Sequence, residues 1–401
     1  MNILVLDTIH GGKEIARHLS SLGHTVDCVD VYRGREGIST DEALSRQYDL
    51  VAAPVHLTPD HPLMQIAGTA YTTHHEIVGT ILRPLHLARC IEITGTRGKT
   101  TTAHALAHGM HGPGVLHTST GTYRFPGKTL LWKKSITPAS LIDAAEQAAS
   151  IGGWLIAEES IGVSGAGDLG ILTSDIDYLI AGGTKSALGE KRRMLAGCRE
   201  VLCAPGTGDV IPGAIATEDI VSLRGTRCSY AYEGRRGSFD HPLFEITGYR
   251  IPLMTAAAAL CILGEDPALL STFSALEARM KVTEEGERVV VDNANSGACL
   301  ATTCDAAALA RRLLPAGPLT LVVGAESSTV CEGFPFADIA EVIKNTSPAT
   351  VIIVGDQYRS CSTDDLPAAP LSIVSSLEEG AALARSVTGK GAIVLAVKTW
   401  R

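Results

Sequence analysis

A short segment with the residue types of a phosphate-binding loop lies within residues 90–108, CIEITGTRGKTTTAHALAH. The mostly apolar residues 90–93 predict a strand, two glycines follow, and Lys-Thr opens an Ala/Leu-rich helix. Glycines let a loop turn its N–H groups toward an anion, and the helix N-terminus adds partial positive charge. The lysine can reach the outer phosphates of a nucleotide, and the next hydroxyl can hold Mg²⁺. We therefore predict an ATP and Mg²⁺ site formed by Gly95, Thr96, Arg97, Gly98, Lys99, Thr100 and Thr101.

The spacing of this loop differs from the common phosphate loop, G-x-x-x-x-G-K-[ST]. That pattern would place glycine at position 93, where this chain has Ile93, and the observed spacing is the shorter G-T-x-G-K-T. A glycine turn capped by threonines is the alternative interpretation. The strand before the loop and the helix after it favour phosphate binding.

Two carboxylates end another predicted strand, in residues 154–160, WLIAEES. A carboxylate at the carboxyl end of a strand beside a phosphate loop is a typical Mg²⁺ ligand. Because strand residues alternate between faces, only one of Glu158 and Glu159 can point at the loop. A solvated glutamate pair is the alternative.

The surrounding sequence predicts strands and helices that alternate along the chain. We expect strands at 2–7, 25–31, 50–54, 115–118, 170–173, 319–323, 350–354 and 392–397, with helices at 12–22, 139–150 and 253–263. The first of these strands resemble half of a Rossmann fold. Their loop DTIHGG departs from G-x-G-x-x-G, so the pattern does not favour NAD binding.

Composition excludes several classes of protein. A net charge of −9 over 401 residues argues against general nucleic-acid binding, and no apolar run approaches ~20 residues, so we expect no membrane span. The N-terminal segment MNILVLDTIHGG is expected to form a strand, and its apolar part is too short for a signal peptide. Ten scattered cysteines without a C-x-x-C pair indicate reduced core residues of a cytoplasmic protein.

Histidine is concentrated in the first third of the chain, where twelve of the thirteen occur. Pairs such as His74 and His75 suit a metal ion or an anionic substrate, and the alternative is solvated or capping side chains. His104 and His108 have a helical i, i+4 spacing, and we expect them at the surface.

The short loop form resembles the nucleotide loop of the Mur ligase family, and the resemblance extends over the whole chain. It implies a three-domain α/β fold: a Rossmann-like substrate domain at 1–88, a central P-loop ATPase domain with a mostly parallel sheet at 89–280, and a Rossmann-like C-terminal domain at 281–401. The family's E-x-S pattern selects Glu158 over Glu159 as the catalytic, Mg²⁺-side carboxylate.

The same resemblance points to a second metal ligand. Residues 186–195 are similar to the family's S…K-x-x segment. In that segment a lysine is carbamylated and coordinates Mg²⁺, and Lys191 is the matching residue here. The family's D-H element is absent, and Ser174 replaces an Asn. The alternative for Lys191 is a solvated basic helix face.

Further nucleotide-binding residues are implied beyond residue 270. Residues 278–280 resemble the family's G-R-M hinge, and residues 289–296 resemble its D-x-A-H-N-P signature. They give Arg279, Asp292 and Asn295 as nucleotide-binding residues. Ile251 and Met254 replace two Asn residues that the family uses near adenine.

Together these features predict an ATP-dependent ligase that activates a carboxylate as an acyl phosphate. With these departures from the Mur ligase pattern, the chain is most similar to the coenzyme F(430) synthetase family. That resemblance implies intramolecular carbon–carbon closure of a nickel tetrapyrrole. A polyanionic small-molecule substrate suits the arginines of the first 89 residues, Arg17, Arg33, Arg35, Arg46, Arg83 and Arg89. An amide ligase and a non-ligase P-loop kinase or ATP-gated binding module stay open, as does the oligomeric state.

Overall fold

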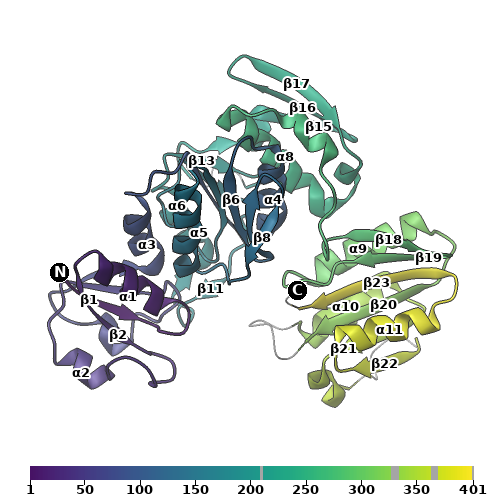
Figure 1. Ribbon diagram of the computed structural model, residues 1–401. Helices are drawn as coiled ribbons and strands as arrows, with labels where there is room; N and C mark the ends of the chain where they lie inside the picture. Colours follow the sequence, from purple (N-terminus) through teal and green to yellow (C-terminus); the bar gives the residue numbers. More distant parts are fainter. Residues whose placement is uncertain (208–210, 327–333, 363–368, 400–401) are drawn as a thin grey trace. The chain divides into compact units, whose positions relative to one another are not determined.

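The computed structural model in Figure 1 describes residues 1–207, 211–326, 334–362 and 369–399. In these ranges the chain forms sheets of four, eight and six strands and two smaller sheets, with helices between the strands. The expected α/β fold, with a mostly parallel central sheet, is confirmed. The chain divides into two compact units, Met1–His241 with Ile251–Thr272, and Pro242–Arg250 with Phe273–Arg401. The domain boundaries expected after residues 88 and 280 stay predictions.

The N-terminal sheet is parallel and has the order β2-β1-β3-β4. Its strands are β1 (Asn2–Leu6), β2 (Thr25–Val29), β3 (Leu50–Ala53) and β4 (Ala70–Thr73), with helices α1 (Gly12–Ser21), α2 (Thr40–Leu44), η1 (Pro62–Met64) and α3 (His74–Leu82). Alternate residues of β1 enter two separate cores, Ile3 and Val5 in one, Leu4 and Leu6 in the other. A strand buried on both faces must be apolar throughout, which is why β1 carries no polar alternation.

Strand β2 ends at Val29, two residues earlier than expected. The Asp30 carboxylate accepts hydrogen bonds from the backbone N–H groups of Tyr32, Arg33 and Arg35, at 2.9 to 3.2 Å. An aspartate that binds the following amides forms a turn, so the apolar Val31 does not extend the strand.

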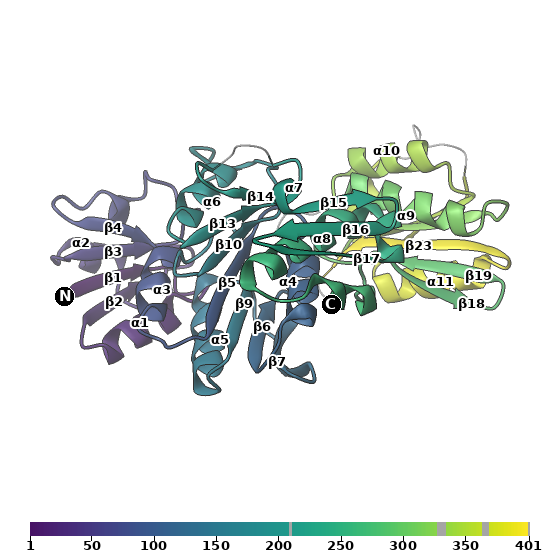
Figure 2. The ribbon, with the colours of Figure 1, turned by 90° about the horizontal axis from the view of Figure 1, so that it is seen from above.

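The central sheet has the order β14-β13-β10-β5-β9-β6-β7-β8, and among its described strands only the β6–β7 and β7–β8 pairs are antiparallel. Figure 2 shows β13, β10, β5, β9 and β6 side by side. The strands are β5 (Arg89–Thr94), β6 (Gly114–Thr118), β7 (Gly121–Phe125), β8 (Thr129–Trp132), β9 (Trp154–Glu158), β10 (Leu169–Leu172), β13 (Glu200–Cys203) and β14 (Ile215–Ala216). Its helices are α4 (Lys99–Gly109), α5 (Pro138–Ser150), α6 (Ala187–Leu195) and α7 (Thr217–Ile220).

Several further elements of this part of the chain, like β7, β8, β13 and β14 above, were not predicted from the sequence. They are β11 (Leu179–Ile180) with β12 (Lys185–Ser186), the antiparallel sheet β15 (Val221–Arg224), β16 (Arg227–Tyr232) and β17 (Arg235–Asp240), and η3 (Pro267–Thr272). Helix α8 (Thr247–Leu263) begins six residues before the expected start at 253 and contains Pro252.

The second unit is built on a six-stranded sheet of order β18-β19-β23-β20-β21-β22, parallel except for β18. Its elements are η2 (Pro242–Glu245), β18 (Lys281–Glu285), β19 (Arg288–Asp292), α9 (Leu300–Leu313), β20 (Leu319–Ala325), α10 (Phe336–Thr346), β21 (Thr350–Val354), η4 (Asp356–Ser360), β22 (Leu371–Val374), α11 (Leu377–Val387) and β23 (Gly391–Lys398). The central strands are fully apolar, as expected for parallel strands covered by helices.

Nine cysteines lie in the described ranges, and all nine are free thiols, five of them buried and four half-buried. Cys331 lies outside the described residues. Within those same ranges, no helix has both the length and the apolar character that a bilayer crossing requires.

Candidate active site

The predicted phosphate loop connects the end of β5 at Thr94 with the start of α4 at Lys99. Gly95 and Gly98 have φ values of 139° and 83°, in the region that side chains rarely adopt. A Cβ on Gly95 would also lie 2.2 Å from Thr173 Oγ1, so glycine is needed there for close approach. The structure thus forms the strand–loop–helix geometry that the sequence predicted.

The end of β10 fixes the shape of this loop. The Thr173 hydroxyl donates to the carbonyls of Thr94 and Arg97, at 3.1 and 2.5 Å. The Ser174 hydroxyl accepts hydrogen bonds from the N–H groups of Thr96, at 2.8 Å, and Arg97, at 3.2 Å. Two loop amides therefore point at Ser174. The N–H groups in the first turn of α4 have no intrahelical acceptor, which makes that turn the part of the segment best suited to a phosphate.

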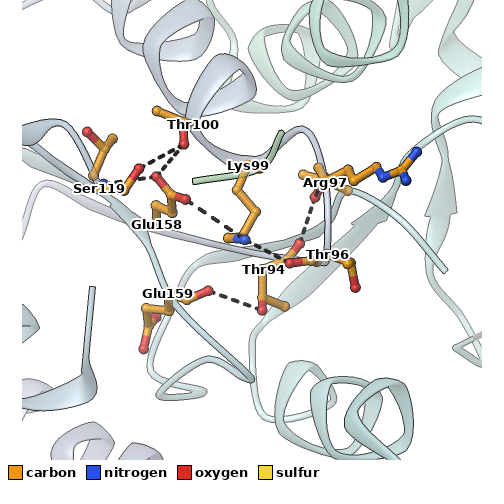
Figure 3. Close-up of polar contacts among 12 residues, drawn as sticks. Thr94, Thr96, Arg97, Lys99, Thr100, Ser119, Glu158 and Glu159 are labelled. Atoms are coloured by element: carbon orange, nitrogen blue, oxygen red, sulfur yellow. Dashed lines mark hydrogen bonds and ion pairs between the residues drawn. The ribbon is translucent and has the colours of Figure 1, made fainter. Parts of the chain in front are cut away.

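Lys99, Thr100 and Glu158 come together at the start of α4 (Figure 3). The Thr100 hydroxyl donates to Glu158 Oε2 at 2.8 Å, and Lys99 Nζ lies 3.9 Å from Glu158 Oε1. Lys99 Nζ also donates to the Gly95 carbonyl at 2.9 Å. The carboxylate is only 3% exposed, so a cation is held beside it with little screening by water.

Ser119 joins this group and was not predicted from the sequence. Its N–H donates to Glu158 Oε2 at 3.1 Å, and its hydroxyl lies 3.2 Å from Thr100 Oγ1. Ser119 follows β6, which pairs in parallel with β9, so its position at the carboxyl edge follows from strand order. A hydroxyl residue directly after a buried strand was the available signal.

Glu159 lies on the other face of the strand end and takes no part in the Thr100 contact (Figure 3). Its side chain is fully buried, and burial together with the nearby Glu92 raises its pKa well above the usual value. Glu92 is also fully buried, and burial raises its pKa, although it accepts hydrogen bonds from the Gly165 and Gly167 amides. The two neighbouring carboxyl groups, Glu158 and Glu159, therefore sit in opposite environments.

Lys191 lies on α6 and is 1% exposed. Its Nζ donates to Thr96 Oγ1 at 3.3 Å and lies 4.9 Å from the centroid of the Tyr178 ring. The alternative interpretation of Lys191 as part of a solvated basic face is wrong, because the side chain points toward the phosphate loop rather than into water. Arg193 on the same helix is exposed and pairs with Glu76 and Glu190.

Helix α8 lies beside the loop, because a Cβ on Gly98 would be 3.5 Å from Pro252 Cγ. Met254 is 9% exposed and Ile251 is 40% exposed. These apolar side chains offer no amide group, so the two Asn residues that the Mur ligase resemblance places near adenine have no counterpart here.

Arg279, Asp292 and Asn295 belong to the second unit. Arg279 stands between Ala278 and Met280, whose φ values of 57° and 54° are unusual for residues with side chains. The Tyr249 hydroxyl donates to the Arg279 carbonyl at 2.7 Å, and Asn295 Nδ2 donates to the Ala278 carbonyl, also at 2.7 Å. The structure thus ties Asn295 to this segment, while nucleotide binding by the three residues stays a prediction.

The histidines differ from expectation. His74 and His75 are buried rather than solvated, and burial lowers the pKa of each to about 4, so they are neutral core residues. His104, expected at the surface, is 5% exposed, and its Nε2 lies 3.0 Å from Thr120 Oγ1. Helix α4 is covered on nearly all sides, whereas His108 is exposed as expected.

Residues 282–399 match the family described as "Coenzyme F430 synthetase CfbE, C-terminal domain". The whole chain is also similar to a coenzyme F(430) synthetase from Methanosarcina acetivorans. The two are 30% identical over 470 aligned positions, which cover 100% of this chain and 98% of that protein.

Solved structures with low sequence identity share the fold. A pseudomurein peptide ligase type C from Methanothermus fervidus matches with a TM-score of 0.54 at 14% identity, over 99% of this chain and 96% of that chain. A bifunctional folylpolyglutamate synthase/dihydrofolate synthase from Yersinia pestis matches with a TM-score of 0.56 at 16% identity, over 82% and 90%. Both likenesses concern the architecture alone.

The opposite environments of the two glutamates predict opposite effects of isosteric substitution. We expect Glu158→Gln to lower ADP release at least about 10- to 100-fold, the range for loss of a group that supports a metal ligand, because Glu158 is itself the expected Mg²⁺ ligand. Glu159→Gln should leave turnover near the wild-type rate, because that group is buried away from the loop. ADP release from both purified variants, with folding checked by circular dichroism, measures this. Equal losses in the two variants would contradict the assignment.

The raised pKa of Glu159 predicts a pH-dependent stability. The folded chain holds a proton on this group above pH 4.5, where an unfolded glutamate loses it, so unfolding free energy falls as pH rises. Glu159→Gln removes this pH-dependent decrease in the free energy of unfolding. As pH rises, the free energy of unfolding of the variant should therefore increase relative to that of wild type, by up to about 1.4 kcal/mol per pH unit. Urea denaturation of both proteins from about pH 5 to 8 tests this. A difference that does not change with pH would mean that Glu159 is ionised.

Proposed function

The chain belongs to the coenzyme F(430) synthetase family, and we propose that it is an ATP-dependent ligase that closes a ring of a nickel tetrapyrrole. In the proposed reaction, a side-chain carboxylate of the substrate joins a carbon atom of the same molecule. The full-length likeness to a coenzyme F(430) synthetase carries this proposal. The contacts among Lys99, Thr100 and Glu158 support ATP binding at the start of α4.

The chemistry has two steps. A substrate carboxylate oxygen attacks the γ-phosphorus of ATP, which forms an acyl phosphate and releases ADP. A carbon nucleophile of the same substrate, having lost its proton, then attacks the acyl carbon and displaces inorganic phosphate. The result is one new carbon–carbon bond, one ketone, and one ADP and one phosphate for each ring closed.

Phosphoryl transfer requires the protein mainly to position ATP and the substrate carboxylate and to neutralise the charge of the phosphates. Lys99 is the cation proposed to meet the outer phosphates, and the first turn of α4 supplies N–H donors. The Thr173 hydroxyl, which donates to the Arg97 carbonyl, and the Ser174 hydroxyl, which accepts from the Thr96 N–H, fix the shape of the loop. A loop fixed in advance loses little conformational entropy when phosphates bind.

Mg²⁺ fits the oxygen donors at this place. Hard divalent cations prefer carboxylate and hydroxyl oxygens, and the Glu158 carboxylate and Thr100 hydroxyl already lie together in a buried position. We propose these two groups as its protein ligands, with Lys191 as a further ligand once carbamylated. The ion would neutralise phosphate charge during transfer.

Two other functions are distinguished by simple requirements. An amide ligase would need a separate amine, such as an amino acid, for turnover. A kinase or an ATP-gated binding module would turn over or bind ATP without activating a carboxylate.

Cytoplasmic location is proposed as well, because the nine described cysteines are free thiols.

Burial of Lys191 beside Thr96 favours a chemical role for this lysine, since buried lysines are rare unless paired or coordinated. We expect Lys191→Ala to lose most of its turnover and to regain part of it when short carboxylates such as acetate are added. The exposed Arg193→Ala on the same helix is the control and should keep wild-type turnover. Absence of rescue, with no mass corresponding to added CO₂ on the intact protein, would refute carbamylation.

The proposed function predicts that purified protein consumes ATP with the nickel seco-tetrapyrrole acid as the only other organic substrate. ADP release and ring closure, followed by absorption spectroscopy, should agree in about one-to-one stoichiometry. Lys99→Ala should abolish both signals while circular dichroism stays unchanged.

Two results would overturn this assignment. A strict need for glutamate, ammonia or another amine would move the protein to the amide ligases. Phosphate release at the same rate without any carboxylate substrate would indicate a non-ligase ATPase or binding module.

A further inference from the structure

The carboxyl edge of the N-terminal sheet gathers side chains that the proposed ATP chemistry does not use. In the order β2-β1-β3-β4, strand β2 lies on one side of β1, and β3 and β4 lie on the other. The direction in which strands are added to the sheet therefore reverses at β1. Ligands of open parallel sheets bind beyond the carboxyl ends of the strands at such a reversal. Asp7 follows β1, Tyr32 follows β2 and His56 follows β3, so three strand ends contribute to one place.

Asp7 is held rigidly at this edge. It is fully buried and has a φ of 74°, which is unusual for a residue with a side chain. Its Oδ1 accepts hydrogen bonds from the Ile9 N–H at 2.9 Å and the His10 N–H at 3.1 Å. Its Oδ2 lies 2.8 Å from His10 Nδ1. One carboxylate therefore fixes both the loop and the imidazole ring.

His10 presents its other ring nitrogen outward. Its side chain is 51% exposed, and no residue in the described part of the chain hydrogen-bonds its Nε2. Metal-binding histidines commonly have this arrangement, in which a carboxylate holds one ring nitrogen and leaves the other for the metal. A histidine that only packs in a core would be covered, as His74 and His75 are.

His56 and Tyr32 complete the group. The Tyr32 hydroxyl lies 2.9 Å from His56 Nε2, and these two rings are nearly parallel. The His10 ring is perpendicular to both, with centroid distances of 5.6 Å to Tyr32 and 6.0 Å to His56. One ligand atom from each of Asp7, His10 and His56 lies within 4.8 Å of the others.

We propose that Asp7, His10 and His56 bind a divalent first-row transition metal, supplied either as a hydrated ion or as the nickel of a tetrapyrrole. Two imidazoles with one carboxylate suit nickel, zinc or iron rather than Mg²⁺. The second source depends on the proposed function. A hydrated ion can take all three side chains when His10 binds it through Nδ1, in place of its hydrogen bond to Asp7. A macrocycle already fills four positions around nickel and leaves axial places only, so His10 Nε2 alone would coordinate it, with Asp7 orienting the ring.

The neighbouring turn suits the second source. Asp30 anchors residues 30–35 through the amides of Tyr32, Arg33 and Arg35. Both arginines are exposed, and guanidinium groups bind carboxylates such as those around a tetrapyrrole. Arg46, in contrast, is already paired with Asp27 and Glu42.

The first arm of the test uses Ni²⁺ alone, titrated calorimetrically into metal-stripped full-length protein without nucleotide. We expect one site per chain, with affinity lowered at least about tenfold in Asp7→Asn, His10→Ala and His56→Ala. Asparagine tolerates the backbone conformation at position 7, so that variant should fold. His24→Ala, a histidine of the same domain outside the cluster, is the matched control and should bind as wild type.

The second arm adds the nickel seco-tetrapyrrole acid without ATP and records its absorption spectrum, which changes when an imidazole becomes an axial ligand. We expect a change with wild type, His24→Ala and Lys99→Ala, and none with His10→Ala. Binding of Ni²⁺ alone supports the hydrated ion, and a His10-dependent change with the tetrapyrrole only supports the macrocycle.

Two outcomes would overturn the inference: no His10-dependent signal in either arm, or an equal loss in His24→Ala. Failure of the proposed function gives a different result. Metal binding would then persist in both wild type and Lys99→Ala while no ATP-dependent ring closure is seen.

Discussion

The hydrogen bond from the Thr100 hydroxyl to the Glu158 carboxylate joins the two halves of the candidate ATP site across 58 residues of sequence. It depends on the pairing of β5 with β9, in which Ile93 lies opposite Glu158. Parallel pairing brings the carboxyl end of one strand beside the loop that leaves the other. A shift of this register by one residue would turn Glu158 away and bring its neighbour toward the loop.

The same strand end keeps two kinds of carboxyl group apart. Glu158 faces Lys99 and Thr100, where a cation compensates its charge, and Glu159 faces the buried Glu92, where burial favours the protonated form. A charged group without compensation in such a place would be costly, which is why burial favours the neutral form of Glu159. The alternation of side chains at the end of β9 therefore decides which of the two neighbouring carboxyl groups faces Lys99 and Thr100.

Both candidate sites use the edge formed by the carboxyl ends of parallel strands. At the ATP site the edge carries oxygen donors and a lysine, which suit phosphates and Mg²⁺. At the N-terminal sheet it carries two imidazoles and a carboxylate, which suit a softer transition metal. The same geometric rule thus supplies two chemistries, because the residues that directly follow each strand differ.

Local patterns in the sequence were enough to predict the strand–loop–helix segment at residues 90–108, the carboxylate beside it and the parallel α/β fold. These patterns are apolar strands, loop glycines and strand alternation. The burial of Lys191, whose contact with Thr96 spans 95 residues, and the burial of His104 become visible only in the folded chain. The tertiary structure also revealed Ser119 and the cluster around Asp7. Each of these depends on which strands lie side by side, and strand order is fixed by packing over the whole sheet rather than by residues near in sequence.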